Sequence, residues 1–551
     1  MKEKKSVHVV KLKLKTTKKD DMIIDRRFHA IAHIHNIMVK HAQNCLKQIW
    51  RNTEYKQTLE NLCAAKKQLA DVEKKTSKAQ KKIENNNIDN NILNEIQNLL
   101  DEQKRILKEI NTTKERLSKI RKDFKLTKND FEKYICVNTN VPAKNGSKGR
   151  RRYKNLLSAS QIQKEVDRVW QGTEKVMFSN GKTVHFKKYE QFKTISGKSN
   201  ESGAIFNLET LTVKWNGLVL KCKAPDKNNS YAWEALKGQI KYCDIERKMF
   251  PNGWHYYASI VISGNPPKKL KNTGTKTMGL DLGVSTIAAV TDDTAFLEEL
   301  APDKEKYNKA ISEIQKAMDR SKRISNPDKF NDDGTVKKGS KKKWIYSNRY
   351  QKNKRRLKYI YRKKSAYIKQ FHEILANRLI AESLYIITED MNFAALKKKA
   401  KKTERSTKAV KVKSKAGIVK LVRKFKRKKR FGKSISNRCP SKFLSILERK
   451  CILYGGMVVK VNTIKFKASQ YDHSDDTYIK VRLIDRDKKV GEYKVQRDLY
   501  SAYLLKNSNT ELTKPNRKEC IDGFEKFVQI QNALISELNS KGVSMKQCFG
   551  F

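Results

Sequence analysis

The spacing of apolar residues changes along the chain and predicts different structures for successive regions. Residues 6–15, SVHVVKLKLK, alternate apolar and basic side chains, which predicts a strand with one solvated face. Residues 26–50 have helical apolar spacing, and a pair of long helices joined by the turn ENNNIDNN (84–91) is predicted next. In the second helix of the pair, apolar residues step by three and four, which indicates a coiled-coil seam. The seam contains Ile96, Leu99, Gln103, Ile106, Ile110, Thr113, Leu117 and Ile120.

Between residues 183 and 268 the apolar period shortens to two, which is typical of strands. The stretch LTVKWNGLVLKCKAP places Asn216 and Gly217 between two apolar runs, and KMFPNGWHYYASIVISG places Asn252 and Gly253 in the same kind of position. Asn-Gly is a strong signal for a two-residue hairpin turn. We expect a small β-barrel or sheet here, joined by the N-terminal strand, so that a helical block interrupts a β domain.

The third region mixes strands and helices. Strands are predicted at 277–282, 285–291, 384–390 (LYIITED) and in MVVKVN, and the sequence from about 298 to 382 is helical and strongly basic. The stretch SKFLSILERKCILYGG is a helix that the pair Gly455-Gly456 should end. Strands alternating with helices predict a mixed α/β sheet.

Charge narrows the class of protein further. The chain of 551 residues has 122 Lys and Arg against 58 Asp and Glu, which gives a formal net charge of +64. Such a charge repels itself unless a polyanion binds, and nucleic acid is the commonest polyanionic partner. The length suggests roughly three or four domains. No apolar run is long enough to cross a membrane and no apolar signal core follows the N-terminus, so a cytoplasmic location without membrane association is expected.

The nine cysteines are scattered through the sequence. The closest pair, Cys439 and Cys451, is twelve residues apart, so no Cys-x-x-Cys clip for zinc exists. Scattered single cysteines fit a reducing compartment, where they serve as small core residues and disulfides are not expected.

Asp281 is a carboxylate in the middle of a strand-like apolar run, TMGLDLGVSTIAAVTDD (277–293). A buried carboxylate costs several kcal/mol unless it is paired or coordinated. Glu389 ends the apolar strand LYIITED, and ligands of α/β sheets collect at such strand ends. Asp498 precedes LYSAYLL, whose apolar residues have helical spacing, so this carboxylate opens a helix.

Three carboxylates from two strands and a helix would form an oxygen-rich site for Mg²⁺ or Mn²⁺. Two such ions about 3.5–4 Å apart can activate water and stabilise the leaving oxygen in phosphodiester cleavage. A metal site would therefore explain the burial of Asp281.

The motifs GLDLGVSTIAAVTDD, IITEDMNF and VQRDLYSAYL resemble the three RuvC motifs of transposon-encoded TnpB proteins and compact type V CRISPR effectors. The stretch KRFGKSISNRCPSKFLSILERKCILYGGMVVKVN is similar to the segment between the second and third motifs of that family. The resemblance covers residues 276–505 well, whereas the N-terminal half matches only in layout.

The resemblance implies an RNase H-like (RuvC) nuclease, an RNA guide and metal-dependent cleavage of a target DNA. Asp281, Glu389 and Asp498 would be the catalytic carboxylates and the ligands of two Mg²⁺ or Mn²⁺ ions. The expected fold class is multidomain α/β and α+β, with a β-barrel wedge domain interrupted by a helical recognition lobe and followed by a mixed-sheet nuclease domain. The predicted parts are the wedge domain (1–24 and 181–270), the helical lobe with its coiled-coil hairpin (25–180), the nuclease domain with helical and basic insertions (271–505) and a C-terminal tail (506–551).

One feature departs from the family pattern. The family usually carries a four-cysteine zinc ribbon just before the third motif, but the segment from Phe466 to Asp498 contains no cysteine. His473 alone cannot hold zinc and is expected to be a hydrogen-bonding loop residue. We therefore expect no zinc.

The third carboxylate has two competitors, Asp485 and Asp487, because the family often shows Asp-Arg-Asp at its third motif and LIDRDKKVGEY contains that triplet. The residues after Asp487 form a turn without an apolar face, whereas LYSAYLL after Asp498 has one. We therefore assign Asp498 and expect Asp485 and Asp487 to be exposed hairpin charges.

Two basic segments are candidate nucleic-acid surfaces. Residues 397–433 are rich in Lys and Arg and would form a solvated loop in the free protein, ordering on a polyanion. Residues 341–364 mix cations with aromatic residues, which either stack on bases or belong to the core. The predicted nucleic-acid-binding residues are Lys397, Lys398, Arg423, Arg427, Arg430, Lys433, Arg355, Arg356 and Tyr350.

These patterns favour an RNA-guided, metal-dependent DNA endonuclease of transposon or CRISPR origin. One alternative is an RNA-guided DNA-binding repressor with little or no cleavage, although a binder has no need for three buried carboxylates. A second alternative is a general basic RNA-binding protein with a helical-hairpin arm, which would not explain acidic positions on apolar strands.

Overall fold

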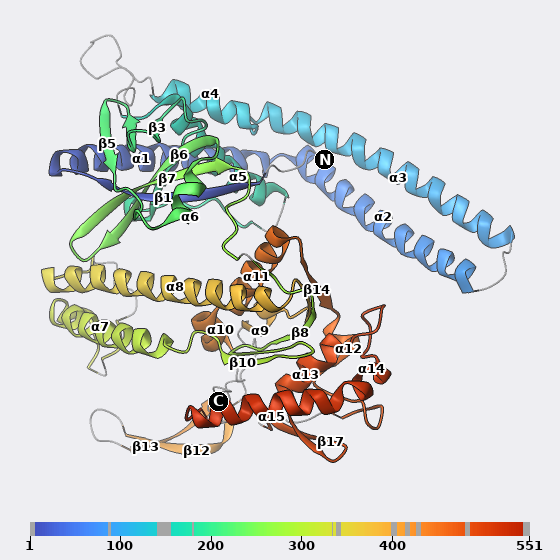
Figure 1. Ribbon diagram of the computed structural model, residues 1–551. Helices are drawn as coiled ribbons and strands as arrows, with labels where there is room; N and C mark the ends of the chain where they lie inside the picture. The colour runs from blue at the N-terminus through green and yellow to red at the C-terminus, as the bar shows by residue number, and fades with distance from the viewer. Residues whose placement is uncertain are drawn as a thin grey trace, which may run out of the picture. The chain divides into compact units, whose positions relative to one another are not determined.

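The computed structural model describes residues 6–85, 90–139, 156–178, 181–270, 272–332, 334–337, 343–397, 405–413, 419–425, 431–479 and 485–543. The chain divides into two compact units (Figure 1). Unit 1 consists of Met1–Lys248 and Trp254–Pro266, and unit 2 consists of Met249–Gly253 and Pro267–Phe551. No described helix combines the length and apolar character needed to cross a membrane.

Unit 1 combines an antiparallel sheet with long helices. Its helices are α1 (Lys18–Ile49), α2 (Thr53–Asn85), α3 (Asn90–Asp123), α4 (Lys128–Thr139), α5 (Ala159–Phe178), the short 3-10 helix η1 (Tyr189–Gln191) and α6 (Ser230–Leu236). Its strands are β1 (Val7–Lys15), β2 (Thr194–Ile195), β3 (Ala204–Asn207), β4 (Thr212–Trp215), β5 (Leu218–Cys222), β6 (Ile240–Phe250) and β7 (Gly253–Ser263).

The sheet of unit 1 has the strand order β2-β6-β7-β1-β5-β4-β3, so the predicted N-terminal strand lies in the middle of it. The predicted turn at Asn216-Gly217 is confirmed, and both residues have positive φ angles of 39° and 81°, which suit a tight hairpin. The end strands β2 and β3 do not pair with each other among the described residues. The predicted β-barrel is therefore wrong: this sheet is open, because alternation along each strand does not determine whether the last strand closes on the first.

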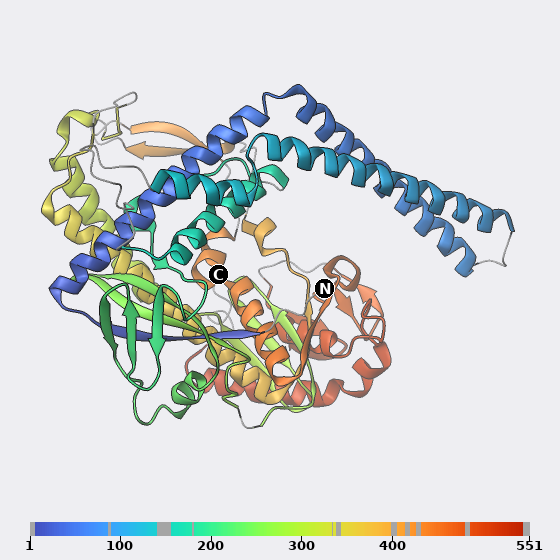
Figure 2. The same ribbon diagram turned by 90° about the horizontal axis from the view of Figure 1, so that it is seen from above.

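The helices α2 and α3 form the predicted hairpin and run side by side (Figures 1 and 2). The apolar seam positions Leu99, Ile106, Ile110, Leu117 and Ile120 of α3 are buried, and α2 buries Tyr55, Leu62, Ala65 and Val72. Part of the predicted turn, residues 86–89, lies outside the described residues. The hairpin is therefore held together by the seam that the spacing predicts.

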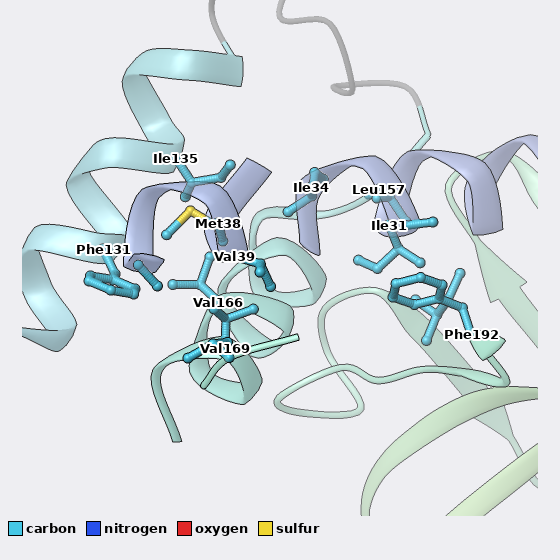
Figure 3. Packing of buried hydrophobic residues seen from close by; sticks show 14 of the residues in the cluster. Ile31, Ile34, Met38, Val39, Phe131, Ile135, Leu157, Val166, Val169 and Phe192 are labelled. Atoms are coloured by element: carbon cyan, nitrogen blue, oxygen red, sulfur yellow. The ribbon is translucent and has the colours of Figure 1, made fainter. Parts of the chain in front are cut away.

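One continuous apolar core joins the strands and helices of unit 1. Around α1, the side chains of Ile31, Ile34, Met38 and Val39 pack with residues of α4 and α5 (Figure 3). The same core includes Leu12 and Leu14 of β1 together with residues of β7. A Thr17–Asp20 capping box begins α1.

Unit 2 contains a mixed sheet, helices and several short strand pairs. Its helices are α7 (Lys304–Ile324), the 3-10 helix η2 (Pro327–Lys329), α8 (Asn348–Glu382), α9 (Phe393–Lys397), α10 (Gly432–Arg438), α11 (Pro440–Tyr454), α12 (Thr463–Phe466), α13 (Arg497–Lys506), α14 (Arg517–Asp522) and α15 (Phe524–Ser540). Its strands are β8 (Thr277–Leu282), β9 (Thr286–Val290), β10 (Ala295–Glu299), β11 (Tyr385–Glu389), β12 (Arg405–Lys413), β13 (Val419–Phe425), β14 (Met457–Val461), β15 (Tyr471–Asp472), β16 (Thr477–Tyr478), β17 (Asp487–Val490) and β18 (Tyr493–Gln496).

The main sheet of unit 2 has the order β10-β9-β8-β11-β14. Strands β8, β11 and β14 are parallel, and β9 and β10 are antiparallel to their neighbours. The predicted mixed α/β architecture is confirmed. Met278, Leu280 and Leu282 of β8 pack with apolar residues of α8 and α11, so this face of the sheet is covered by those two helices.

The other face of the sheet carries α13. Ala288 and Val290 of β9 are buried with Leu499 and Ala502 of this helix. Helix α15 belongs to the same core through Phe524, Phe527 and Val528. The residues predicted to be a tail (506–551) therefore include α14 and α15, which both contribute buried residues to the core of unit 2. The apolar spacing of α15 is local, and only its packing on α13 shows that it is not an appendage.

Candidate active site

The parallel pairing of β8 with β11 places two of the predicted carboxylates side by side in register. Gly279 pairs with Ile387 and Leu280 pairs with Thr388, so Asp281 and Glu389 follow at the same level of the sheet. Successive strand residues alternate between faces, and Leu280 and Ile386 belong to the core under α8 and α11. Asp281 and Glu389 therefore lie on the opposite face, which is the face that α13 covers.

Gly279 allows α13 to approach β8 closely. A Cβ atom at this position would overlap the carbonyl oxygen of Ala502 and the amide nitrogen of Lys506, both in the backbone of α13. Only glycine fits such a contact. Since Asp498 lies in the first turn of this helix, the close approach also determines how far Asp498 stands from Asp281 and Glu389.

Asp498 is buried and pairs with two arginines. Nη1 of Arg486 lies 3.3 Å from one carboxylate oxygen, and Nη2 of Arg497 lies 3.0 Å from the other. Gln496 caps the helix by accepting a hydrogen bond from the amide of Leu499. The predicted helix after Asp498 is confirmed, and its first turn is fixed by the cap and by both guanidinium groups.

The carboxylates influence one another electrostatically. Loss of hydration raises the pKa of Asp281 well above its usual value, the negative charges of Asp498 and Glu389 raise it further, and Arg497 and Arg486 oppose this shift. Burial raises the pKa of Glu389 to about 7, and a hydrogen bond from the backbone amide of Ala468 opposes the shift. Asp281 and Glu389 are half-buried, and acidic groups with raised pKa values are typical of functional sites.

The donor chemistry of these residues fits a hard divalent cation, because all three side chains offer oxygen and negative charge. Within the described part of the chain, however, no three His, Cys, Asp or Glu side chains lie close enough to share one metal ion as they stand. The two arginines occupy the carboxylate of Asp498, and a cation would have to compete with them. A bound cation would reduce the electrostatic repulsion among the three carboxylates, which favours its binding.

The structure distinguishes Asp498 from its competitors. Asp487 begins β17 in the β17–β18 hairpin, is exposed and lies 2.7 Å from Nζ of Lys494. Asp485 offers its backbone carbonyl to Nη1 of Arg497, at 3.0 Å. The negative charge of Asp498, in contrast, is the largest charge effect that raises the pKa of Asp281. The contact of Arg486 with Asp498 was not anticipated from the sequence, although Arg486 stands between the two competing aspartates.

An aromatic core surrounds His473 where the family usually has a zinc ribbon. His473 is buried, its Nδ1 lies 2.7 Å from the hydroxyl of Tyr500, and its ring packs against Phe524. Burial lowers the pKa of His473. The predicted hydrogen-bonding role is confirmed, but the residue is buried in a core that α15 helps to form.

The structure places some of the predicted nucleic-acid-binding residues. Arg355 and Arg356 are exposed on α8, and Lys397 and Lys433 are exposed near the ends of α9 and α10. Tyr350 is half-buried against Tyr346. Arg423 lies in the backbone pairing of β12 with β13, a strand pair that the sequence did not indicate, and Lys398, Arg427 and Arg430 lie outside the described residues.

The site predicts how the stability of unit 2 depends on pH. Because the pKa of Glu389 rises from 4.5 to about 7 on folding, the folded protein holds a proton that the unfolded chain releases between these values. Stability should therefore fall as the pH rises through this window. In EDTA at mildly alkaline pH, Glu389→Gln is expected to raise the free energy of unfolding by about 1–2 kcal/mol, after allowance for solvent screening.

Thermal unfolding of the two proteins across this pH range measures the effect. The exposed Glu525→Gln in α15 serves as the matched control and should change the melting temperature little. Equal melting curves for wild type and Glu389→Gln at every pH would contradict the assignment of a partly desolvated carboxylate that destabilises the fold when ionised.

Unit 2 is a mixed α/β unit with a candidate site at Asp281, Glu389 and Asp498, and part of it matches a known family model. Residues 259–400 match the family model OrfB_IS605, described as a probable transposase. This match confirms the predicted resemblance to the transposon-encoded TnpB and type V effector family over the stretch that contains Asp281 and Glu389. No curated protein matches the chain.

Two solved structures are also similar. A cryo-EM structure of a Cas12f1–sgRNA–target DNA complex is 10% identical, with a TM-score of 0.41, and covers 92% of this chain and 99% of its own. A CRISPR–Cas12f ternary complex is 12% identical, with a TM-score of 0.24, and covers 91% of this chain and 99% of its own. With TM-scores below 0.5, neither likeness establishes a shared fold.

Proposed function

We propose that this chain is an RNA-guided, divalent-metal-dependent DNA endonuclease of the TnpB and type V effector kind, with an RNase H-like (RuvC) nuclease domain in unit 2. The observation that carries the proposal is that Asp281 and Glu389 lie level on neighbouring parallel strands, on the face covered by α13, whose first turn carries Asp498. Loss of hydration and, after it, the negative charges of Asp498 and Glu389 raise the pKa of Asp281, and a bound cation would offset both effects. The match of residues 259–400 to a transposase family supports this reading.

Asp281, Glu389 and Asp498 would hold Mg²⁺ or Mn²⁺. Bound there, two such ions supply activation of water and stabilisation of the leaving oxygen in phosphodiester hydrolysis. The chain's own residues orient the ligands: the Ala468 amide donates to Glu389, and Arg486 and Arg497 hold both oxygens of Asp498. The same guanidinium groups are suited to bind a phosphate once the carboxylate of Asp498 coordinates a metal cation in their place.

The charge of the chain supports nucleic-acid partners. The net charge of +64 means that the chain has many more Lys and Arg side chains than contact with a single duplex requires. Four exposed candidates lie in unit 2: Arg355, Arg356, Lys397 and Lys433. With a guide RNA, base pairing would read the target sequence and the protein would bind backbones. This arrangement explains high charge without a base-reading motif.

The purified protein is expected to carry a structured RNA that high salt or ribonuclease removes. Sequencing this RNA identifies the guide, and target DNA complementary to it should then be cut in Mg²⁺. The stripped protein should lose sequence-directed cleavage, and adding back the RNA should restore it. Full-rate cutting by RNA-free protein would overturn the guided mechanism, and guided binding of DNA without cutting would instead favour a repressor.

A further inference from the structure

The segment that connects α7 to α8 exposes an aromatic ring among cations. Tyr346 is 40% exposed, and its ring stacks on Tyr350 with the centroids 4.4 Å apart and the planes 20° apart. The neighbouring Ile345 is 67% exposed. Between residues 337 and 372 the sequence has fifteen Lys and Arg and no Asp or Glu. The candidate active site makes no use of this surface.

The backbone around Tyr346 is held in place before any partner binds. The side chain of Asn326 donates to the carbonyl of Ile345 and accepts from its amide, both at 2.8 Å. Ser347 caps α8 by accepting from the amide of Tyr350, at 3.1 Å, and its hydroxyl lies 2.8 Å from that of Ser321. A ring that is already ordered loses little conformational entropy when a ligand stacks on it.

Trp344, two residues earlier, has a different role. The ammonium groups of Lys322 and Lys329 lie over its ring, 3.7 and 4.9 Å from the centroid, and Phe330 meets it edge-on. These cation–π contacts fix positive charge beside the exposed segment. Trp344 therefore holds cations, and Tyr346 is the ring that remains available to a ligand.

We infer that Tyr346, backed by Tyr350, is a stacking platform for an unpaired base of single-stranded DNA. Bases stack on exposed aromatic rings, and the flanking cations complement the phosphates of the same strand. Ile345 extends the apolar surface beside the ring, as aliphatic side chains do where they pack against unstacked bases. This inference rests on the nucleic-acid partner of the proposed function but not on cleavage.

Two labelled strands of equal length and charge separate stacking from charge attraction. The full-length protein, stripped of nucleic acid, is titrated with oligothymidylate and with an abasic sugar–phosphate strand, and fluorescence anisotropy gives each Kd. Tyr346→Ala should weaken binding of oligothymidylate roughly tenfold and leave binding of the abasic strand unchanged. Tyr346→Phe, which keeps the ring, should bind like the wild type.

Tyr361→Ala is the matched control. Tyr361 lies on α8, is 45% exposed and has its hydroxyl near Gln315, at 3.4 Å, and no other ring among the described residues stacks on it. This variant should change the affinity for oligothymidylate less than twofold. Thermal unfolding of each variant verifies that the fold is retained.

Several outcomes would overturn the inference. Unchanged affinity of Tyr346→Ala for oligothymidylate would do so, as would an equal loss for the abasic strand, which indicates a general loss of charge contact. An effect confined to oligouridylate would assign the surface to RNA, and an altered oligomeric state of the variant would assign it to a protein contact. Failure of the wild type to bind any strand would overturn the proposed function as well, whereas binding that ignores Tyr346 overturns only this inference.

Discussion

Asp281→Asn is expected to lower the rate of guided DNA cleavage by about a thousandfold or more, while affinity for guide RNA and target DNA stays nearly unchanged. Asp281 is a proposed cation ligand on β8, the central strand of the sheet, and its carboxylate interacts electrostatically with both Asp498 and Glu389. Binding, in contrast, depends on the many Lys and Arg that give the chain its net charge of +64. Single-turnover cleavage and a binding titration on the same complex measure the two effects separately.

Glu389→Gln extends this test because it should also lose cleavage, although it is expected to be more stable than the wild type without metal. A variant that gains stability and loses activity cannot owe its inactivity to unfolding. EDTA should stop the wild type, and Mg²⁺ or Mn²⁺ should restore it. Parallel loss of binding and cleavage in a folded Asp281→Asn protein would count against a role in the chemistry.

The second large effect concerns the third carboxylate. Asp498→Asn is expected to be inactive, because this residue faces the sheet from the first turn of α13. The double change of Asp485 and Asp487 to Asn should keep most cleavage, because Asp487 is an exposed hairpin residue and Asp485 contacts Arg497 through its backbone. Cleavage assays of both proteins with the same guide and target decide between the two assignments.

The double variant is also the control, because it removes two negative charges close to Asp498 in the sequence without altering α13. The double variant should keep an unfolding free energy within about 1 kcal/mol of the wild type, as most surface substitutions do. Thermal unfolding of Asp498→Asn verifies that this protein is still folded at the assay temperature, because it removes the partner of two buried arginines. DNA cleavage by Asp498→Asn, together with no cleavage by the double variant, would contradict the assignment of Asp498 as the third carboxylate.

Much of the site could be predicted because its parts are local. The apolar runs around Asp281 and before Glu389 predict β8 and β11 nearly to the residue, and the apolar spacing after Asp498 predicts α13. Gly455, with a φ of 89°, ends α11 where the sequence predicts it. Such features depend on a few neighbouring residues, whose side-chain pattern already shows which face is buried.

Other features had no local signal. The open edge of the unit 1 sheet depends on whether β2 reaches β3, and the burial of His473 depends on α15 folding back over it. The strand pair β12–β13 lies in a basic segment whose composition suggested a loop. The first two outcomes depend on contacts between residues far apart in the chain, whereas β12–β13 is a local hairpin whose strands the many Lys and Arg obscure.

The sequence by itself determined the strands and helix that carry the three carboxylates, the excess of positive charge and the absence of clustered cysteines. The tertiary structure decided that β8 and β11 pair in parallel with Asp281 level with Glu389, that Gly279 lets α13 approach, and that Arg486 and Arg497 hold Asp498. The physical reason is that periodicity records whether a side chain is buried, whereas register and close approach depend on which distant backbone it is buried against.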